Sequence, residues 1–412
     1  MFNDLTNALE WLYEQKKLHK REDLSRITKC IELLNICPNY KIVHIAGTNG
    51  KGSTASYIKK MLMLKGFKVG FFVSPYVISF NERIQINDDY IQDAEILDII
   101  NRLYEFQNDY YAEYNDIIPF FELTFLMALL YFAKNSIDYA IIECGIGGLL
   151  DATNVLDSDI AVITNIGYDH MQQLGSTLEE IAYHKLGITK PNKPCFTAVD
   201  NYLKEYFENY AEINKVDLRI ITDKVSNIVE DTNLLFSYED ERYETILKAS
   251  YQAYNAALAI SVIRYIDNNY PKKLIDKALM EVSWPGRYEY IAKNIIIDGA
   301  HNIHGIDALV NSLKKYNCKI KIVFTALHDK SIQEMIASLD KVASKYYFTT
   351  INDKRATNSN EFINYTTKDY EVFADYKEAL TKAQKELKAD EILVVTGSLH
   401  FISEVRKYLL KE

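Results

Sequence analysis

The sequence contains few glycines, prolines and cysteines. Only 15 of its 412 residues are glycine and 7 are proline, and no proline follows Pro285. This composition excludes collagen-like and other fibrous classes, and a hydrophobic share of 48% excludes a disordered chain. The five cysteines have no regular spacing, so neither a disulfide framework nor a zinc site is expected. Such cysteine usage is typical of a reducing cytoplasm.

The sequence also lacks a basic segment and a membrane-spanning run. Acidic residues outnumber basic ones by 57 to 47, whereas a nucleic-acid or anionic-membrane binder usually carries the opposite sign. The amino terminus, MFNDLTNALEWLYEQKK, is polar and acidic early on, unlike a signal peptide. The most apolar stretch, residues 117–133, is interrupted by Pro119, Glu122 and Thr124, which favours a buried helix. We therefore expect a cytoplasmic monomer with no nucleic-acid or membrane partner.

Strand and helix patterns alternate along the chain, which predicts an α/β fold with parallel sheets. At about 150 residues per domain, the length corresponds to two or three domains. We place a boundary at the Trp-Pro-Gly-Arg break of residues 284–287, so that residues 1–287 form a first domain and residues 288–412 a smaller α/β domain. The expected strands are 41–46, 68–73, 138–143 and 159–164 in the first domain, and 294–298, 319–325, 346–350 and 391–396 in the second.

Two more local patterns predict secondary structure. Ser176 and Glu179 have the spacing of a capping box, which predicts a helix that continues to about Lys185. Residues 227–247 contain no glycine and show β-branched alternation, which predicts an antiparallel hairpin.

The glycines are clustered, and one cluster lies between a predicted strand and a predicted helix that runs from about residue 53 to 65. Residues 44–54 read HIAGTNGKGST. Backbone N–H groups in such a loop, together with the helix N-terminus, can cradle phosphate, and the lysine adds a mobile charge. A serine or threonine hydroxyl after it can ligate magnesium. The pattern G-x-x-x-x-G-K-[ST] is not matched literally, because Ile45 stands at its first glycine position and a glycine follows the lysine. The residues predicted to bind nucleotide here are Thr48, Asn49, Gly50, Lys51, Gly52, Ser53 and Thr54.

A phosphate loop of this kind needs a metal-binding carboxylate at the end of a neighbouring strand. Glu143 ends the apolar run DYAIIE, and His170 follows another predicted strand in the run TNIGYDH. The carboxyl ends of parallel strands gather ligands at one edge of a sheet. Taken alone, Glu143 could cap a strand and His170 could be structural. Beside the loop, we predict that both bind metal.

Four motifs in order along the chain resemble the folylpolyglutamate synthase/dihydrofolate synthase family, within the ATP-dependent Mur ligases. They are GTNGKGST at residues 47–54, IECGIGGLLDATN at 142–154, ITNIGYDH at 163–170 and DGAHN at 298–302. The resemblance runs from about residue 1 to residue 405. The first motif separates this branch from the peptidoglycan ligases, which usually have threonine where Gly52 stands.

The resemblance implies an amino-terminal P-loop ATPase domain, a carboxy-terminal Rossmann-like domain, and ATP between them. It also implies a reaction in which L-glutamate is joined to the γ-carboxyl of a (tetrahydro)folate, or to dihydropteroate. The acceptor carboxylate first takes the γ-phosphoryl group of ATP, which gives an acyl phosphate and ADP. The glutamate amine then attacks and phosphate leaves. Lys51 and two magnesium ions would offset the negative charge that the two reactants bring together.

The resemblance assigns roles to individual positions. Ser53 matches the hydroxyl on the nucleotide-bound magnesium, and Ser74, Glu143 and His170 match the ligands of a second magnesium. Lys185 matches the lysine that the family carbamylates, which turns a cation into an anion. Lys51, Lys185 and His170 are thereby the predicted catalytic residues. The nucleotide contacts of the helix near residue 252 and of the second domain are matched by Gln252, Asn255, Arg287, Asp298 and His301. The predicted substrate-binding residues are Ser74, Tyr76, Arg83 and Asp151.

Several positions depart from the family pattern. Tyr76 stands where many members have histidine, Leu149 replaces a frequent arginine, Tyr251 replaces the histidine of H-Q-x-x-N, and Ile303 replaces a proline. None of these positions is the loop lysine or a predicted metal ligand. We interpret them as variation around the substrate.

Two alternatives differ in substrate or class. Another Mur-type ligase would act on a nucleotide-linked peptidoglycan precursor, but only about 40 residues precede the phosphate loop, too few for the extra domain that binds the uridine nucleotide. A P-loop kinase or GTPase would not explain the DGAHN motif. Dihydropteroate and existing folates both remain possible acceptors, because they differ in pocket detail around Tyr76. We predict extension of folate polyglutamates, with dihydrofolate synthesis as a second activity.

Overall fold

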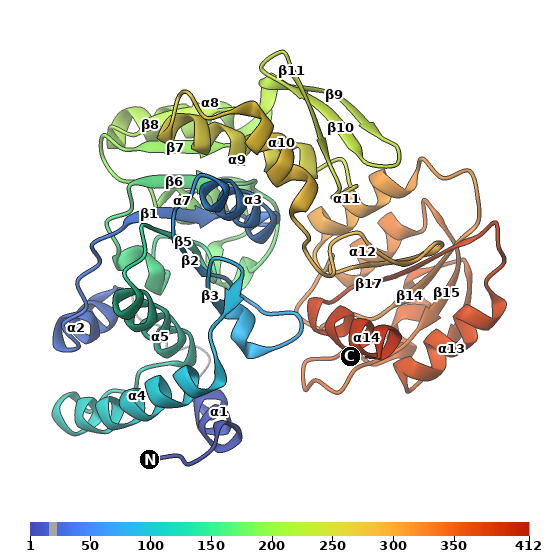
Figure 1. Ribbon diagram of the computed structural model, residues 1–412. Helices are drawn as coiled ribbons and strands as arrows, with labels where there is room; N and C mark the ends of the chain where they lie inside the picture. The colour runs from blue at the N-terminus through green and yellow to red at the C-terminus, as the bar shows by residue number, and fades with distance from the viewer. Residues whose placement is uncertain (16–22, 412) are drawn as a thin grey trace. The chain divides into compact units, whose positions relative to one another are not determined.

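The computed structural model describes residues 1–15 and 23–411. Its chain divides into two compact units (Figure 1). The first unit contains the described parts of residues 1–166, 170–224 and 254–278, and the second contains residues 167–169, 225–253 and the described part of 279–412. The predicted α/β class with a P-loop domain and a second α/β domain is confirmed. The boundary between residues 287 and 288 stays a prediction.

The first unit is built around an eight-stranded sheet in the order β4-β3-β2-β5-β1-β6-β7-β8. The strands from β2 to β8 in that order run parallel, and β3 and β4 form an antiparallel edge. Both neighbours of the central β1 are therefore parallel to it. The strands are β1 (Lys41–Ala46), β2 (Val69–Phe72), β3 (Ile84–Ile86), β4 (Asp89–Tyr90), β5 (Tyr139–Glu143), β6 (Ile160–Ile163), β7 (Pro194–Thr197) and β8 (Asp217–Ile220).

Helices connect these strands, as parallel pairs require. The helix after the phosphate loop is buried over most of its length, from Gly52 to Leu62, so it is a core helix. The α-helices are α1 (Leu5–Glu14), α2 (Ser25–Leu33), α3 (Lys51–Leu64), α4 (Asp93–Tyr114), α5 (Phe120–Asn135), α6 (Met171–Leu174), α7 (Leu178–Leu186) and α8 (Asn201–Asn214), with 3-10 turns η1 (Phe80–Arg83), η2 (Ala152–Val155) and η3 (Thr222–Lys224). Two more helices contain residues of both units, α9 (Gln252–Ile266) and α10 (Lys272–Glu281).

The second unit contains two sheets. A three-stranded antiparallel sheet has the order β11-β10-β9, and a six-stranded sheet has the order β12-β13-β17-β14-β15-β16, parallel except for β12. The strands are β9 (Val225–Glu230), β10 (Leu234–Tyr238), β11 (Glu241–Thr245), β12 (Glu289–Ala292), β13 (Ile295–Asp298), β14 (Ile320–Phe324), β15 (Ala343–Phe348), β16 (Asp369–Val372) and β17 (Ile392–Thr396). The helices are α11 (Ile303–Leu313), α12 (Ile332–Leu339), α13 (Tyr376–Glu386) and α14 (Leu399–Leu410), with the 3-10 turn η4 (Ser359–Tyr365).

Side-chain alternation explains why the six-stranded sheet is covered on both faces. Ile296 and Val394 belong to a buried cluster with α11 and α12, whereas Ile297 and Val395, one residue along, belong to a cluster with α13 and α14. Successive residues of a strand point to opposite faces, so an unbroken apolar strand needs a cover on each side. This is the arrangement that a parallel α/β sheet requires.

The structure corrects two local predictions. The capping box of α7 consists of Thr177 and Glu180, one residue beyond the predicted Ser176 and Glu179. The strand predicted at residues 346–350 is β15, which begins earlier, at Ala343. The antiparallel hairpin predicted for residues 227–247 is present and extends to three strands.

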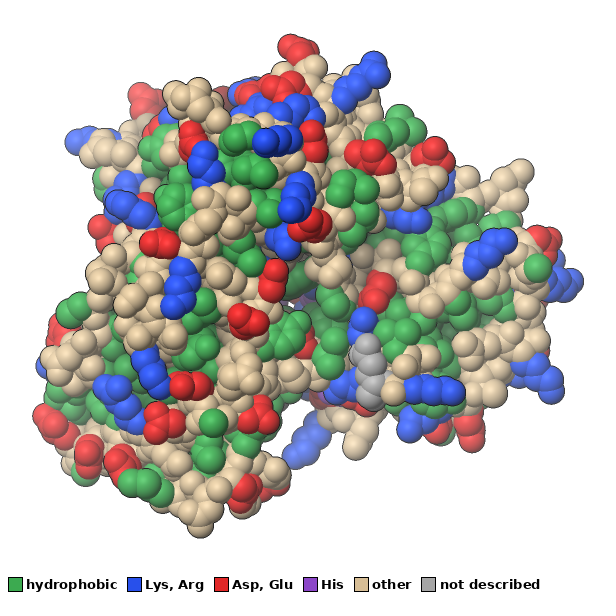
Figure 2. All heavy atoms as spheres, viewed as in Figure 1, with side chains coloured by type: hydrophobic (Ala, Val, Ile, Leu, Met, Phe, Trp, Pro, Cys, Tyr) green, Lys and Arg blue, Asp and Glu red, His purple; other side chains and the backbone are tan. Residues whose placement is uncertain are grey.

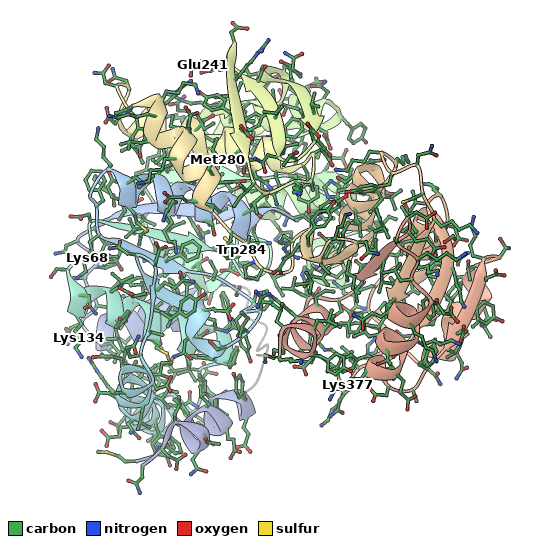
Figure 3. The ribbon with its side chains drawn as sticks, turned by 45° about the vertical axis from the view of Figure 1, so that its right-hand side comes forward. Lys68, Lys134, Glu241, Met280, Trp284 and Lys377 are labelled. Carbon is green, nitrogen blue, oxygen red and sulfur yellow. The ribbon has the colours of Figure 1, made fainter. Side chains whose placement is uncertain are left out.

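Each unit holds one of the chain's two tryptophans. Trp11 lies on α1 of the first unit, where its ring packs against Phe2 at 5.9 Å and Tyr104 at 5.3 Å between centroids. Trp284 belongs to the second unit and follows α10 (Figure 3).

Acidic and basic side chains are interspersed on the face shown in Figure 2. No single-sign patch dominates that face, in keeping with the sequence. Among the described residues, no helix is both long enough and apolar enough to cross a membrane.

Candidate functional site

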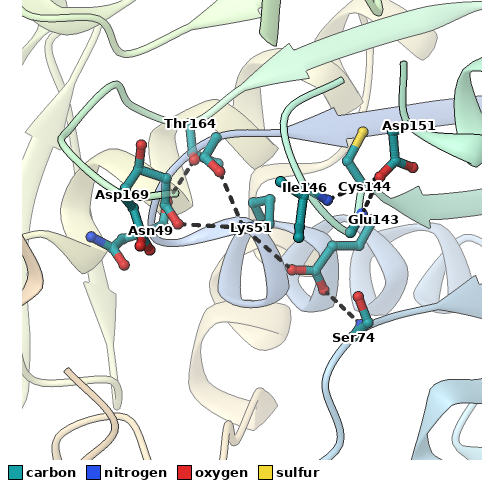
Figure 4. A network of polar contacts seen from close by, with 12 residues as sticks. Asn49, Lys51, Ser74, Glu143, Cys144, Ile146, Asp151, Thr164 and Asp169 are labelled. Atoms are coloured by element: carbon teal, nitrogen blue, oxygen red, sulfur yellow. Dashed lines mark hydrogen bonds and ion pairs between the residues drawn. The ribbon is translucent and has the colours of Figure 1, made fainter. Parts of the chain in front are cut away.

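Four parallel strands of the first unit end at one edge of the sheet and bring the predicted site residues together. The order β2-β5-β1-β6 places Ser74, Glu143 and the phosphate loop in successive positions along this edge. Thr164 follows β6 on the other side of the loop. Figure 4 shows these side chains gathered around Lys51. Ligand sites of open α/β sheets form at this edge, outside the carboxyl ends of the strands.

Two glycines of the loop are required by close packing. Gly50 has φ +83°, and a Cβ added there would lie 2.4 Å from Asn255 Oδ1. Gly47 has φ +147°, and a Cβ there would lie 1.8 Å from Thr164 Oγ1. A side chain would be strained at either position and would also clash. The predicted nucleotide contact Asn255 therefore packs directly against the loop, which the sequence could not show.

Residues after β6 brace the loop through hydrogen bonds. The Thr164 hydroxyl donates to Asn49 O at 2.6 Å, and Asn165 Oδ1 accepts from Asn49 N at 2.9 Å. Asn165 O also accepts from Thr48 N at 3.0 Å. Thr164 and Asn165 were not among the predicted site residues. The sequence feature that could have indicated them is the pair of polar residues directly after a buried strand, within the motif ITNIGYDH.

Lys51 is the first residue of α3, and its ammonium group lies over the loop. Its Nζ donates to Gly47 O at 3.1 Å and Thr48 O at 3.3 Å, and lies 3.9 Å from Glu143 Oε1. Glu143 Oε2 in turn accepts from the backbone N–H of Ser74 at 3.4 Å. The side chain of Lys51 is 17% exposed, so its charge can reach a bound phosphate group.

The donor set at this edge fits a magnesium ion. Within residues 1–15 and 23–411, no group of three or more His, Cys, Asp or Glu side chains is arranged to hold a metal. Magnesium usually takes one or two carboxylates and completes its shell with phosphate oxygens and water, so Glu143 with serine hydroxyls suffices. The Thr54 hydroxyl, on the first turn of α3, is fully buried and has no hydrogen-bond partner among the described residues.

The other two predicted metal ligands lie on the same unit. Ser53 is buried on the first turn of α3, and His170 is the N-cap of α6 with φ +51°. The shared metal role of Glu143 and His170 stays a prediction.

Lys185 is buried, with 3% of its surface exposed. It lies in the last turn of α7. This helix packs against the glycine turn after β5, residues 145–148. A Cβ at Gly148 would lie 3.1 Å from Lys185 O, and Leu149 N donates to His184 O at 2.6 Å. Lys185 is therefore not a solvated helix lysine. Lysine side chains are rarely fully buried in proteins unless they are paired.

A buried chain of polar groups lies behind the glycine turn. Asp151 accepts from Gly145 N at 3.0 Å and Ile146 N at 2.9 Å, and its other oxygen accepts from the Thr153 hydroxyl at 2.5 Å. Thr153 Oγ1 lies 2.8 Å from His44 Nε2. Because the threonine proton goes to Asp151, His44 donates from Nε2. Burial lowers the pKa of His44 to about 3 and raises the pKa of Asp151. The predicted substrate residue Asp151 thus holds the turn with one oxygen and Thr153 with the other.

Tyr76 and Arg83, two of the predicted substrate-binding residues, lie together after β2. The Arg83 guanidinium is 5.1 Å from the centre of the Tyr76 ring. Arg83 is the last residue of η1, whose capping box joins Ser79 and Glu82.

The predicted residues of the second unit gather around Asp298 at the end of β13. Its carboxylate accepts from Tyr288 N at 2.7 Å, Ala300 N at 2.8 Å and the Tyr251 hydroxyl at 3.3 Å. Asp298 is 3% exposed, and burial raises its pKa, opposed by the charge of Arg287. Tyr251, which departs from the family pattern, is thus part of this cluster.

Three other predicted nucleotide contacts belong to the second unit. His301 Nδ1 is 2.9 Å from Gly299 O, and Gln252 is fully buried at the start of α9. Arg287 packs on the turn after β13, since a Cβ at Gly299 would lie 2.5 Å from its Nη1. The binding roles of these residues stay predictions.

Comparison with known proteins shows which family shares this arrangement. Residues 120–263 match the Mur ligase middle domain, and residues 286–399 match the Mur ligase glutamate ligase domain. The chain is 34% identical to the dihydrofolate synthase/folylpolyglutamate synthase of Bacillus subtilis (strain 168), over 99% of this chain and all of that protein.

Two solved structures extend this likeness to the whole fold. Escherichia coli FolC, in complex with DHPP and ADP, superposes with a TM-score of 0.89 at 25% identity, covering 99% of this chain and 98% of that one. A bifunctional folylpolyglutamate synthase/dihydrofolate synthase with Mn, AMPPNP and L-glutamate bound superposes with a TM-score of 0.86 at 26% identity and the same coverage. The chain belongs to the folylpolyglutamate synthase/dihydrofolate synthase family of Mur ligases.

Proposed function

We propose that the protein is an ATP-dependent ligase that adds L-glutamate to the γ-carboxyl of folate polyglutamates, and to dihydropteroate as a second acceptor. One observation carries the proposal. Lys51, Glu143 and Ser74 converge where β1, β5 and β2 end, beside a glycine loop that opens a buried helix. Family membership supplies the acceptor class, because relatives of this fold are named for both folate activities.

The chain's own groups suit a phosphoryl transfer from ATP to a carboxylate. The loop N–H groups and the α3 N-terminus would bind phosphate oxygens, and Lys51 would offset charge as the acceptor approaches. Thr164 and Asn165 would keep the loop in its binding conformation through their bonds to Asn49. An acyl phosphate formed on the acceptor would then react with the glutamate amine, with release of ADP and phosphate.

Magnesium would be held by Glu143, Ser74, His170 and Ser53, and would supply charge neutralisation of the phosphates. A relative of this fold binds Mn with AMPPNP, so a divalent cation at such a site has precedent within the family. We infer two such ions. Carbamylation of Lys185 would place an anion in a buried position. We further propose that the protein acts as a cytoplasmic monomer without nucleic-acid or membrane partners.

A GTPase is disfavoured by the place of its base-reading motif. Asn214, Lys215 and Asp217 have the Asn-Lys-x-Asp spacing, but Asp217 begins β8 and so lies at the opposite edge of the parallel sheet from the phosphate loop. The Asp217 carboxylate is also paired with Arg219 at 2.7 Å. It cannot read a base at the phosphate site.

One assay tests the proposed function. ADP formation is measured with ATP and magnesium, with dihydropteroate or tetrahydrofolate as acceptor, and with or without L-glutamate. We expect ADP formation that requires both acceptor and glutamate, and an acceptor longer by one glutamate residue. ADP formation that is independent of both additions would favour a plain nucleotidase and contradict the proposal.

A further inference from the structure

Arg287, a predicted nucleotide contact, lies in a turn whose backbone departs from ordinary conformations. The turn spans residues 285–288 and follows Trp284 (Figure 3). Gly286 has φ +70° and Tyr288 has φ +50°, so both neighbours of Arg287 adopt the left-handed region. An aromatic residue rarely adopts this conformation, which persists only where surrounding contacts impose it. The second unit therefore stabilises this turn against its own backbone preference.

Three hydrogen bonds hold the backbone of this turn. Gly286 N donates to Glu289 Oε2 at 2.7 Å, and Gly286 O accepts from Gly299 N at 2.8 Å. Tyr288 N donates to Asp298 Oδ2 at 2.7 Å. Two of these bonds attach the turn to the end of β13, where Asp298 and Gly299 lie. The third bond depends on the side chain of Glu289.

A second side chain holds Glu289 in place. Arg406 Nε donates to the two oxygens of Glu289 at 3.1 and 3.2 Å. Glu289 begins β12 and Arg406 belongs to α14, and their side chains are 23% and 13% exposed. The ion pair orients the carboxylate, so that Oε2 stays within reach of Gly286 N. The last helix of the chain is thereby connected to the turn that carries Arg287.

The Arg287 side chain is held less firmly than the backbone around it. Within the described part of the chain, it forms no ion pair and no side-chain hydrogen bond. Its Nη1 lies against the turn after β13, 2.5 Å from a Cβ added at Gly299. A side chain without such partners depends on its own backbone for its position. The place of the Arg287 charge is therefore set by the turn.

We propose that Glu289, fixed by Arg406, is a positioning residue that sets the place of the Arg287 guanidinium for contact with the nucleotide phosphates. Glu289 and Arg406 act through the backbone of the turn and do not themselves touch the nucleotide. The inference rests on the proposed function, which makes Arg287 a nucleotide contact. A misplacement of about 1 Å can lower a rate about 10²-fold, so a carboxylate outside the site can affect the reaction strongly.

Glu289→Ala tests the proposal, with Glu391→Ala as its matched control in the same unit. Glu391 also accepts a backbone N–H, from Lys388 at 3.1 Å, and also pairs with a cation, Lys321 at 2.7 Å. Each substitution removes one acceptor and one ion pair, so both should lower the melting temperature. Only Glu289→Ala should also lower kcat/KM for ATP, by about tenfold or more, because it misplaces Arg287. Equal kcat/KM values for the two variants would overturn the proposal.

A double-mutant cycle with Arg287→Ala separates positioning from a role of Glu289 on its own. Once residue 287 is alanine, Glu289→Ala should change kcat/KM for ATP by less than about twofold, since the residue that it positions is gone. Equal effects in both backgrounds would show that Glu289 does not act through Arg287. Glu289→Gln keeps an oxygen that can accept from Gly286 N, so it should recover most of the loss. A loss as large as that of Glu289→Ala would contradict a role through this bond.

Nucleotide binding keeps this test independent of ligase activity. Calorimetric titration of the whole chain with AMPPNP and magnesium should show about tenfold weaker binding in Glu289→Ala and in Arg287→Ala, and no further loss in the double variant. This result supports positioning even if no glutamate-dependent ADP formation is found, in which case only the proposed function fails. Wild-type affinity in Glu289→Ala contradicts positioning. A wild-type chain that binds no AMPPNP would overturn the nucleotide site and this inference together.

Discussion

The phosphate-loop edge of the first unit and the Asp298 cluster of the second unit use polar residues in opposite ways. Lys51 contacts two carbonyl oxygens at 3.1 and 3.3 Å and one carboxylate at 3.9 Å, and it is 17% exposed. Asp298 accepts three hydrogen bonds between 2.7 and 3.3 Å and is 3% exposed. We call the Lys51 cluster the open centre, because its charged group is partly exposed. We call the Asp298 cluster the closed centre, because its carboxylate is buried.

This difference in exposure predicts which of the two centres contributes mainly to ligand binding and which contributes mainly to the free energy of unfolding. The contacts of the partly exposed Lys51 ammonium group are long, so replacing them by contacts with a ligand costs little free energy. A buried carboxylate with three donors cannot be removed without leaving those donors unsatisfied. We therefore expect substitutions at the open centre to affect turnover, and substitutions at the closed centre to affect the free energy of unfolding.

Lys51→Ala should show the largest effect. Removing the loop cation should lower kcat by about 10²–10³, because its charge acts where negative charge gathers during transfer. The melting temperature should not change. Lys60→Ala is a control on the same helix, since Lys60 pairs with Asp88 at 3.4 Å, away from the loop. Normal turnover with an unchanged KM for ATP would show that the centre is not the nucleotide site.

Glu143→Gln should raise the magnesium concentration needed for half-maximal activity by about tenfold or more. Substituting a residue that only hydrogen-bonds to a metal ligand already lowers metal affinity about tenfold or more, and Glu143 is predicted to bind the metal directly. The measurement is a magnesium titration of ADP formation. Glu95→Gln, at a surface carboxylate paired with Lys134, should leave the titration unchanged. If both variants titrate like the wild type, the carboxylate does not serve a metal.

Asp298→Ala tests the closed centre. It leaves the N–H groups of Tyr288 and Ala300 and the Tyr251 hydroxyl without their acceptor, so the free energy of unfolding should fall by about 1–3 kcal/mol. Thermal or urea unfolding measures this loss. If unfolding is unaffected, the two centres do not differ as described, whatever happens to the KM for ATP.

His44 lies behind the open centre but is itself fully buried, so it should behave like the closed one. The folded pKa is about 3, below the value of 6.5 for a free imidazole, so the unfolded chain takes up a proton first as pH falls. Its contribution is complete above pH 6.5 and is lost between pH 6.5 and about 3, with a slope of up to about 1.4 kcal/mol per pH unit. Unfolding of His44→Gln between pH 7 and 5 should show a flatter dependence. An identical slope in both chains would refute the assignment.

Thr164→Val should have the smallest effect. It removes the hydroxyl that holds Asn49 O at 2.6 Å and keeps the side-chain volume. A single neutral hydrogen bond contributes about 0.5–1.5 kcal/mol, so the KM for ATP should rise by roughly two- to tenfold. Thr189→Val, which also loses a bond to a carbonyl, is the control in the same unit. Equal KM values for both variants would show that bracing does not matter for binding.

Local sequence patterns predicted the parts of the site that are continuous in the chain. The strand, loop and helix around Lys51 were predicted because glycine, lysine and hydroxyl residues follow a buried run directly. Glu143 and His170 were predicted because each follows a predicted strand. The contact between Lys51 and Glu143 depends on the order of the strands in the sheet. That order is set by packing between distant segments, so the bracing by Thr164 and Asn165 was missed.

One further difference comes from a local ambiguity, and another has the same cause as the missed hydrogen bonds of Thr164 and Asn165. The capping box was placed one residue early, because Ser176 and Thr177 precede consecutive glutamates and either pairing satisfies the spacing. The contact between Tyr251 and Asp298 joins residues 47 positions apart. No local pattern carries it.

The distribution of the two tryptophans makes the protein its own optical probe. Because Trp11 belongs to one compact unit and Trp284 to the other, each single-tryptophan chain reports one unit through its intrinsic fluorescence. Emission from Trp284→Phe follows the surroundings of Trp11 alone, and emission from Trp11→Phe follows Trp284. Denaturant titrations of the two chains would reveal whether the units lose structure together or in sequence, without any added dye.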